Sequence, residues 1–301
     1  MGDVTSETQA PFETFRLGRA DGTGRFCIYH PPQGSAVRGL VLHLPAFAEE
    51  MNKSRRMVAL TSRALAVAGF AVLQMDLLGC GDSDDEAPAD LWQVWLDDLA
   101  AALSWLCSRH PGGCIWLWSH RAGCLLASDL AHREARPVRH LLWQPVPQGR
   151  SVVQQLLRLK ASSAWAAGNG KQIVDQARAE LSEGKDLDVA GYSFQAKLIH
   201  QLEAAKFAPP ACPASDLAGA ALIWLEVSNP PGSEPSPAAR AQIAKLEQAG
   251  YAVQTGVASG PPFWQTLEIE DAPELLAQTV AALERHSDAS SFTHTATASL
   301  P

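Results

Sequence analysis

The chain has 301 residues, of which 47% are hydrophobic and 19% charged, and this composition can build a large core without disulfides. Its 24 Lys and Arg against 32 Asp and Glu give a net charge of −8, with no clustered basic stripe. We therefore expect no nucleic-acid partner, because phosphate binding depends on clustered positive charge. No run approaches the roughly 20 apolar residues that span a bilayer, so we also expect no transmembrane segment.

The six cysteines and the N-terminus bear on the cellular compartment. None of the cysteines forms a C-x-x-C pair and several lie in apolar segments, which predicts reduced, buried thiols. The N-terminus is polar and acidic, without the apolar region of a secretion signal. We therefore expect a cytoplasmic protein.

The first half of the chain predicts strands and helices in alternation. It opens with a hairpin of two strands around the turn RADGTG, typical of a sheet edge. The expected strands after the hairpin lie at 37–47, 71–76, 113–118 and 138–146, and the helices between them at 54–70, 89–110 and 122–134. Near-continuous apolar strands separated by helices predict the α/β class, with a doubly wound, mostly parallel sheet.

The alternation stops at about residue 150. Residues 150–210 contain no buried strand pattern and predict a helical insertion, or cap. The expected elements then resume as strands at 218–228 and 251–259 and helices at 236–250 and 271–286. We therefore expect one domain over 13–286 with its cap at about 150–210. The small, polar residues 287–301 predict a disordered tail.

Three short motifs lie at the predicted carboxyl ends of neighbouring strands. They are HLPA at 43–46, the D-x-x-G-x-G-x-S pattern at 76–83, and SHRAG at 119–123. Their order resembles the α/β-hydrolase fold with an inserted helical cap. The resemblance implies that HLPA takes part in an oxyanion hole and that SHRAG is the nucleophile elbow, where G-x-S-x-G is usual. Here Arg121 replaces the central serine.

A closer resemblance covers roughly residues 14–286. The segments HLPAFAEEMNKSRRMVAL, QMDLLGCGDSD, LLWQP and PPFWQTLEIEDAPEL are similar to the family named exosortase A system-associated hydrolase 2. That resemblance implies a bacterial process linked to exopolysaccharide and exosortase, with a protein partner from that system. It implies no particular reaction.

The catalytic triad of a serine hydrolase is not recognisable in the sequence. A guanidinium is always protonated and cannot attack a carbonyl, so Arg121 is no nucleophile. Near the turn the remaining candidates are Ser119, His120 and Cys124. Ser119 comes two residues early for an elbow nucleophile and Cys124 three residues late.

The acid and base positions are also unconventional. The acid candidates after the strand at 218–228 are Asn229, which cannot carry a charge, and Glu234, which we expect in a solvated loop. The expected base position holds GPPFW at 260–264, which has no histidine. The next histidines along the chain are His286, after the last helix, and His294 in the tail. His43, His120 and His200 remain as substitutes.

Arg121 must be compensated, because a helix N-terminus already carries partial positive charge. Glu49 and Glu50 follow the strand that ends at the same sheet edge, so one of them is the expected partner. Asp76 instead begins a Gly-rich turn, where a carboxylate usually binds backbone N–H groups.

The same sheet edge is the expected ligand site. An anion could bind there at the helix N-terminus if Arg121 were not closed by its partner. The predicted ligand-binding residues are Arg121, His43, Ala46, Glu49, Glu50, Lys53, Trp143, Tyr192 and Trp264, with Gln144 as a further pocket wall. The chain lacks H-x-x-x-H and H-E-x-x-H spacing and a complete G-x-G-x-x-G loop, so we expect no metal and no cofactor.

Two functional hypotheses follow. The first is a ligand-binding or accessory protein, an α/β hydrolase that has lost its triad and binds a small molecule or an anion. The second is an active hydrolase of ester-like bonds with an unrecognised nucleophile.

Overall fold

An eight-stranded sheet forms the centre of the protein in the computed structural model, which describes residues 11–18, 22–85, 88–162, 168–211, 221–229 and 234–295. The strand order is β1-β2-β4-β3-β5-β6-β9-β10. The strands are β1 (Glu13–Gly18), β2 (Gly24–His30), β3 (Gly39–Leu44), β4 (Phe70–Met75), β5 (Ile115–His120), β6 (Val138–Trp143), β9 (Ala221–Ser228) and β10 (Ala252–Ser259). β1 and β2 are antiparallel to their neighbours and the other pairs are parallel, which confirms the predicted mostly parallel sheet.

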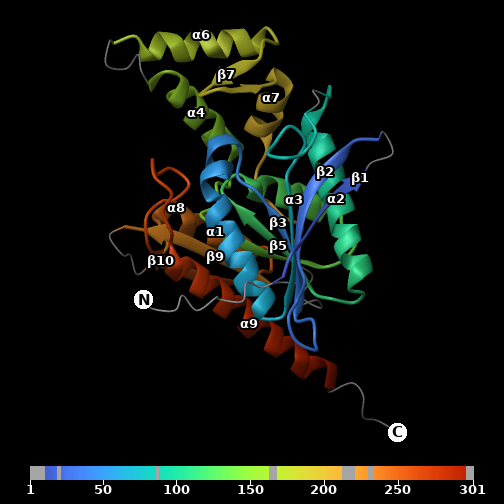
Figure 1. Ribbon diagram of the computed structural model, residues 1–301. Coiled ribbons are helices and arrows are strands. Elements are labelled where there is room, and N and C mark those ends of the chain that lie inside the picture. Colours follow the sequence, from blue (N-terminus) through green and yellow to red (C-terminus); the bar gives the residue numbers. More distant parts are fainter. Residues whose placement is uncertain are drawn as a thin grey trace, which may run out of the picture.

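Helices cover both faces of this sheet (Figure 1). They are α1 (Ala48–Val67), α2 (Leu91–Arg109), α3 (Gly123–Arg133), α8 (Pro237–Gln248) and α9 (Pro273–Thr295). One buried apolar cluster joins the sheet to α2, α3 and α8, and a second joins it to α1 and α9. The two clusters exist because successive strand residues point to opposite faces, and both faces here are apolar.

The cap follows β6 and lies above the carboxyl ends of the parallel strands, at the top of Figure 1. Its described elements are α4 (Gly149–Lys160), α6 (Gly170–Ser182), α7 (Ala196–Ala204) and the hairpin of β7 (Leu187–Val189) and β8 (Tyr192–Phe194). The position over this edge is the expected one, since ligands of open α/β sheets bind there.

A narrow neck connects the cap to the sheet. Gln148 and Lys206 form an isolated antiparallel bridge, and the amide of Phe207 donates to the carbonyl of Pro147 at 2.9 Å. A side chain at Gly149 would place its Cβ 1.7 Å from the carbonyl oxygen of Leu202, so only glycine fits there. The two ends of the cap are thus held together at one point.

The structure differs from the predicted elements in three places. α1 begins at Ala48 rather than at residue 54, because the chain turns there with φ +51° and puts Glu49 and Glu50 in the first helical turn, where the dipole favours acids. The hairpin β7–β8 was not predicted within the helical insertion, because two three-residue strands give too little alternation to detect. α9 continues to Thr295, into the segment predicted as a disordered tail, and residues 296–301 lie outside the described residues.

A buried ion pair ties the antiparallel edge of the sheet to a helix. The Arg25 Nε in β2 donates to the Asp98 Oδ2 in α2 at 2.6 Å, and the two side chains are 2% and 1% exposed. A charge left unpaired at such a site is strongly destabilising.

We predict that Asp98→Asn lowers the free energy of unfolding by about 3 kcal/mol, because it leaves the Arg25 guanidinium buried without a countercharge. The matched control is Asp97→Asn, on the same helix, whose exposed partner is Arg133 and whose effect should stay below about 0.5 kcal/mol. Urea unfolding of the two variants checks this. Equal losses of unfolding free energy in the two variants would show that the buried pair stabilises the protein no more than the exposed one.

Candidate functional site

A strained turn between β5 and α3 forms the base of the site. Arg121 has φ +53°, a left-handed conformation that is rare for a residue with a side chain, and its amide donates to the carbonyl of Trp143 at 2.9 Å. Two residues later, a Cβ on Gly123 would lie 2.5 Å from the carbonyl oxygens of both Leu44 and Pro45. The glycine therefore lets the elbow approach β3 closely, and the sharp turn forms without the usual serine.

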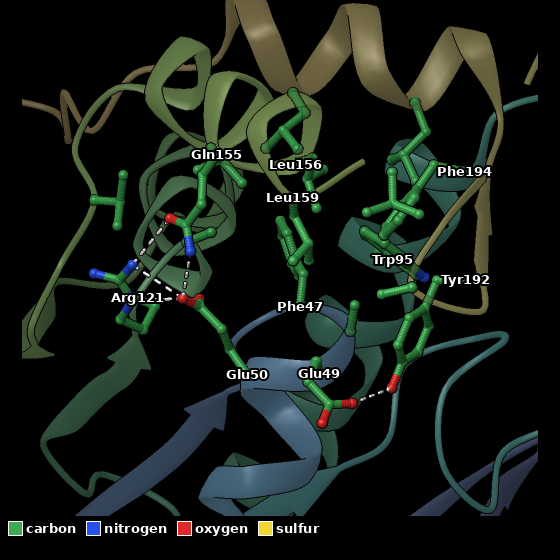
Figure 2. Close-up of a pocket in the computed structure, with 18 residues that line it drawn as sticks. Phe47, Glu49, Glu50, Trp95, Arg121, Gln155, Leu156, Leu159, Tyr192 and Phe194 are labelled. Carbon is green, nitrogen blue, oxygen red and sulfur yellow. Dashed lines mark hydrogen bonds and ion pairs between the residues drawn. The ribbon is translucent and has the colours of Figure 1, made fainter. Parts of the chain in front are cut away.

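The guanidinium of Arg121 is closed by a carboxylate. Its Nε and Nη2 donate to Glu50 Oε1 at 3.1 and 3.0 Å, and Nη2 also donates to Gln155 Oε1 at 3.3 Å (Figure 2). Its Nη1 donates to the backbone carbonyl of Gln144 at 3.5 Å, and the ring of Trp264 lies 5.4 Å from its central carbon. The pair is mostly buried, with side-chain exposures of 12% and 19%. The predicted pairing with Glu49 or Glu50 is confirmed, with Glu50 as the partner.

Asp76 has the separate role that was predicted for it. Its Oδ2 accepts a hydrogen bond from the amide of Asp82 at 3.0 Å, which holds the Gly-rich loop. Its carboxylate also pairs with Arg55 at 3.2 Å. Asp76 is therefore not the main countercharge of the elbow.

The three catalytic candidates near the elbow are buried. The Oγ of Ser119 has no hydrogen-bond partner and is inaccessible, because Ser119 lies within β5 with no exposed surface. The thiol of Cys124 donates to the carbonyl of Val146 at 3.4 Å, and burial raises its pKa to about 12. His120 is 1% exposed and stacks on Phe263, with ring centroids 5.4 Å apart. None of these groups presents a reactive atom to solvent.

Two buried histidines meet beneath the start of α1. His43 and His120 line a small cavity of about 30 Å³, and neither Nε2 has a hydrogen-bond partner. Burial lowers the pKa of His43 to about 3 and holds the pKa of His120 well below its usual value. Within the described part of the chain, no histidine is hydrogen-bonded to a hydroxyl or thiol at the elbow, as predicted.

The acid and base positions hold no matching pair either. Glu234 is 74% exposed and pairs with Arg240, as expected of a solvated loop residue. Phe263 and Trp264 fill the expected base position, and both are buried. His200 is exposed on the cap helix α7, so it lies apart from the elbow.

The remaining acid and base candidates lie elsewhere. Asn229 is exposed after β9. His286 lies on α9 against Trp116, with ring centroids 5.5 Å apart. The side chain of His294 lies outside the described residues.

A pocket between the elbow and the cap is the candidate ligand site (Figure 2). One end of it holds Arg121, Glu50 and Gln155, and another part holds Glu49 and Tyr192, which donates to Glu49 at 3.2 Å. The wall between them is apolar and comes from both the sheet domain and the cap. Its larger side chains are Phe47, Trp95, Val152, Leu156, Leu159, Val189, Phe194, Leu198 and Leu202.

The predicted ligand-binding residues divide into three groups. Arg121, Glu49, Glu50 and Tyr192 line this pocket. His43 and Ala46 line the small cavity beneath α1 instead. Lys53 lies next to the pocket and pairs with Glu49 at 3.6 Å.

The aromatic and amide walls are placed differently from the prediction. Trp143 is fully buried and points to the opposite face, where its indole donates to Thr279 of α9 at 2.9 Å, so it is not a pocket wall. Trp264 packs against the guanidinium of Arg121 but does not line the pocket. Gln144 contributes its backbone carbonyl to Arg121, while its side chain accepts from the amide of Val227 at 2.7 Å.

The cap contributes to the site a residue that was not predicted from the sequence. Gln155 bonds both members of the ion pair, donating to Glu50 at 3.2 Å. It lies on α4, whose apolar positions recur with helical spacing, and this periodicity could have identified the face that turns toward the elbow.

Two other kinds of feature are absent from the described residues. No cluster of three or more His, Cys, Asp or Glu side chains in that part of the chain could hold a metal ion. The described helices include none with the length and apolar character needed to span a membrane.

Known proteins share this architecture. The family described as serine aminopeptidase, S33, matches residues 35–169, which is less than half of the chain, and no curated protein matches the sequence. The structure is similar to a thermostable carboxyl esterase from Bacillus coagulans, with a TM-score of 0.56 and 12% identity over 92% of this chain and 99% of that one. It is also similar to Est1E from Butyrivibrio proteoclasticus with ferulic acid bound, with a TM-score of 0.55 and 14% identity over 90% and 96%.

A lipase in its open form is a further structural relative, with a TM-score of 0.58 and 14% identity over 92% of this chain and 98% of that one. At these identities the likeness is one of fold. The protein has the α/β-hydrolase fold, as predicted.

We predict that Glu50→Gln lowers the free energy of unfolding by about 1–3 kcal/mol, because it leaves the mostly buried Arg121 without a countercharge. Glu49→Gln is the control, since Glu49 is 53% exposed and its ion pair with Lys53 is longer, at 3.6 Å. Chemical denaturation of both variants measures the difference. A Glu50→Gln protein as stable as the control would contradict the role given to the ion pair.

We also predict that stability falls in acid. The folded-state pKa of His43 is about 3 against an ordinary value of 6.5, so the unfolded chain binds more protons between these pH values. The contribution is complete above pH 6.5 and is lost as the pH falls toward 3. Between about pH 7.5 and about pH 5 His43 alone should account for about 2 kcal/mol of unfolding free energy.

Urea unfolding of the wild type and of His43→Phe at both pH values tests this second prediction. Phenylalanine keeps a ring against Trp118 but cannot titrate, so the variant should lose less stability in acid than the wild type. Identical pH profiles for His43→Phe and the wild type would contradict the assignment.

Proposed function

We propose that this protein binds a small molecule in the pocket beneath its cap and does not hydrolyse esters through a serine nucleophile. The observation that carries the proposal is the closed pair of Arg121 and Glu50 at the position where a hydrolase of this fold has its nucleophile. A guanidinium is a donor only, so this position can orient and exclude groups but cannot form an acyl-enzyme.

Loss of the base supports the same proposal. General-base activation needs a proton acceptor within hydrogen-bond reach of the attacking group. At the elbow the nearest histidine, His120, is packed among Phe263, Trp264 and Trp143, and its ring nitrogens bond to nothing. Its depressed pKa follows from that burial and from the adjacent Arg121, and is not the signature of an activated dyad.

The wider role that we propose rests on the sequence resemblance alone. Similarity to exosortase A system-associated hydrolase 2 supports an accessory role in bacterial exopolysaccharide or exosortase-linked processes, carried out in the cytoplasm with a protein partner of that system. The proposed binding role does not depend on this assignment.

Labelling with a fluorophosphonate tests the absence of a serine nucleophile. We expect no covalent adduct on the intact protein in mass spectrometry, because Ser119 is buried and the elbow holds Arg121. An adduct that disappears in Ser119→Ala would overturn the proposal in favour of an active hydrolase. For a thiol nucleophile, ester hydrolysis by the folded protein that disappears in Cys124→Ala would have the same consequence.

We further predict that Arg121→Ser does not hydrolyse p-nitrophenyl acetate or butyrate above the rate of the unmodified protein. The new hydroxyl would have no histidine to accept its proton, since Phe263 and Trp264 occupy the base position. Circular dichroism provides the control that the variant is folded. Turnover that follows a titration near neutral pH would show that a base is present.

A further inference from the structure

The guanidinium at the polar end of the pocket is engaged mainly by groups of the protein itself. Its three nitrogens donate hydrogen bonds to Glu50, Gln155 and the carbonyl of Gln144. Of its five N–H groups, only the second one on Nη1 has no partner among these bonds. Trp264 covers one face of the guanidinium. The carboxylate of Glu50 neutralises its charge at 3.0 Å, and Gln155 bonds to both partners, so this end has no net charge.

The second polar part of the pocket is also internally satisfied. The hydroxyl of Tyr192 donates to Glu49 at 3.2 Å and accepts from the side-chain amide of Asn52 at 2.7 Å. The ammonium of Lys53 lies 3.6 Å from the same carboxylate. Among the residues that line the pocket, the charges therefore occur in pairs or face an adjacent countercharge.

The space between these two parts is enclosed by apolar side chains. In Figure 2, Phe47 and Trp95 come from the sheet domain, while Leu156, Leu159 and Phe194 come from the cap. The cavity volume is about 80 Å³, several times the roughly 10–15 Å³ that one buried water molecule needs. A short aliphatic chain is the kind of group that this surface would remove from water.

We infer that the pocket selects uncharged ligands with an aliphatic body, and that the Arg121–Glu50 pair is its selectivity device. This inference rests on the proposed binding role. A carboxylate entering the pocket would lose its hydration without finding a free cation, and an ammonium would lose its hydration without finding a free anion. A neutral chain ending in a hydroxyl avoids both costs, so the closed pair rejects either sign of charge.

Three probes of equal chain length separate these cases: octan-1-ol, octanoate and octylammonium. Their dissociation constants can be measured by saturation-transfer NMR titration at neutral pH. For the unmodified protein we expect octan-1-ol to bind about tenfold or more tightly than either charged probe. Leu156→Trp fills the apolar wall and should weaken binding of octan-1-ol, which locates the bound chain in this pocket.

Opening the pair from either side should change the selectivity in opposite directions. Glu50→Gln frees the guanidinium, so octanoate should bind about tenfold more tightly while octan-1-ol changes by less than about threefold. Arg121→Gln frees the carboxylate and should instead improve binding of octylammonium. Glu203→Gln is the matched control, because Glu203 pairs with Arg178 at 3.2 Å in the cap without lining the pocket, and it should change none of the three.

The outcomes separate the inference from the proposed function. Octanoate binding as tightly as octan-1-ol in the unmodified protein, without fluorophosphonate labelling, overturns the inference and leaves the binding role intact. Unchanged selectivity in both folded variants, Glu50→Gln and Arg121→Gln, also overturns it. If none of the probes binds the unmodified protein, the binding role fails together with the inference.

Discussion

A permanently charged guanidinium at the amino end of a buried helix is the constraint on which the site depends. Both the helix dipole and desolvation disfavour Arg121 at this position, so a carboxylate has to accompany it. Glu50 meets this need because α1 starts immediately after β3, at the same edge of the sheet as the elbow. The interaction thereby fixes the β3–α1 junction, the elbow and, through Gln155, the first cap helix in one arrangement.

The elbow also shows that backbone architecture and side-chain chemistry are separable. The left-handed turn and the contact of Gly123 with the backbone of β3 belong to the framework, and they persist with arginine at the tip. What is altered is the set of groups around the tip, where a donor replaces the nucleophile and aromatic rings occupy the base position. A fold shared with esterases and a lipase is thus compatible with a site that has different chemistry.

Features that follow from chain topology could be predicted from the sequence. Features that depend on the direction of a side chain could not. Glu50 could be paired with Arg121 because parallel strands deliver their carboxyl ends to one edge. Trp143 was expected as a pocket wall, but strand residues alternate between faces, and Trp143 belongs to the apolar cluster with α1 and α9 while its neighbour Leu142 belongs to the cluster with α2 and α3. The role of Gln155 required the docking of α4 on the elbow, because helical periodicity can indicate which face of α4 is turned inward but not which residues that face meets.

The neck beneath the cap has a consequence for how this architecture can diversify. Because Gln148 and Lys206 are bridged, the inserted segment leaves and rejoins the sheet domain at adjacent points. The stability of the main sheet therefore depends little on the length of the inserted segment, because the entropic cost of closing a loop grows only slowly with added residues. Replacement of the segment between these two positions would exchange one half of the pocket wall as a module, while the elbow and its ion-paired arginine would stay on the unchanged sheet domain.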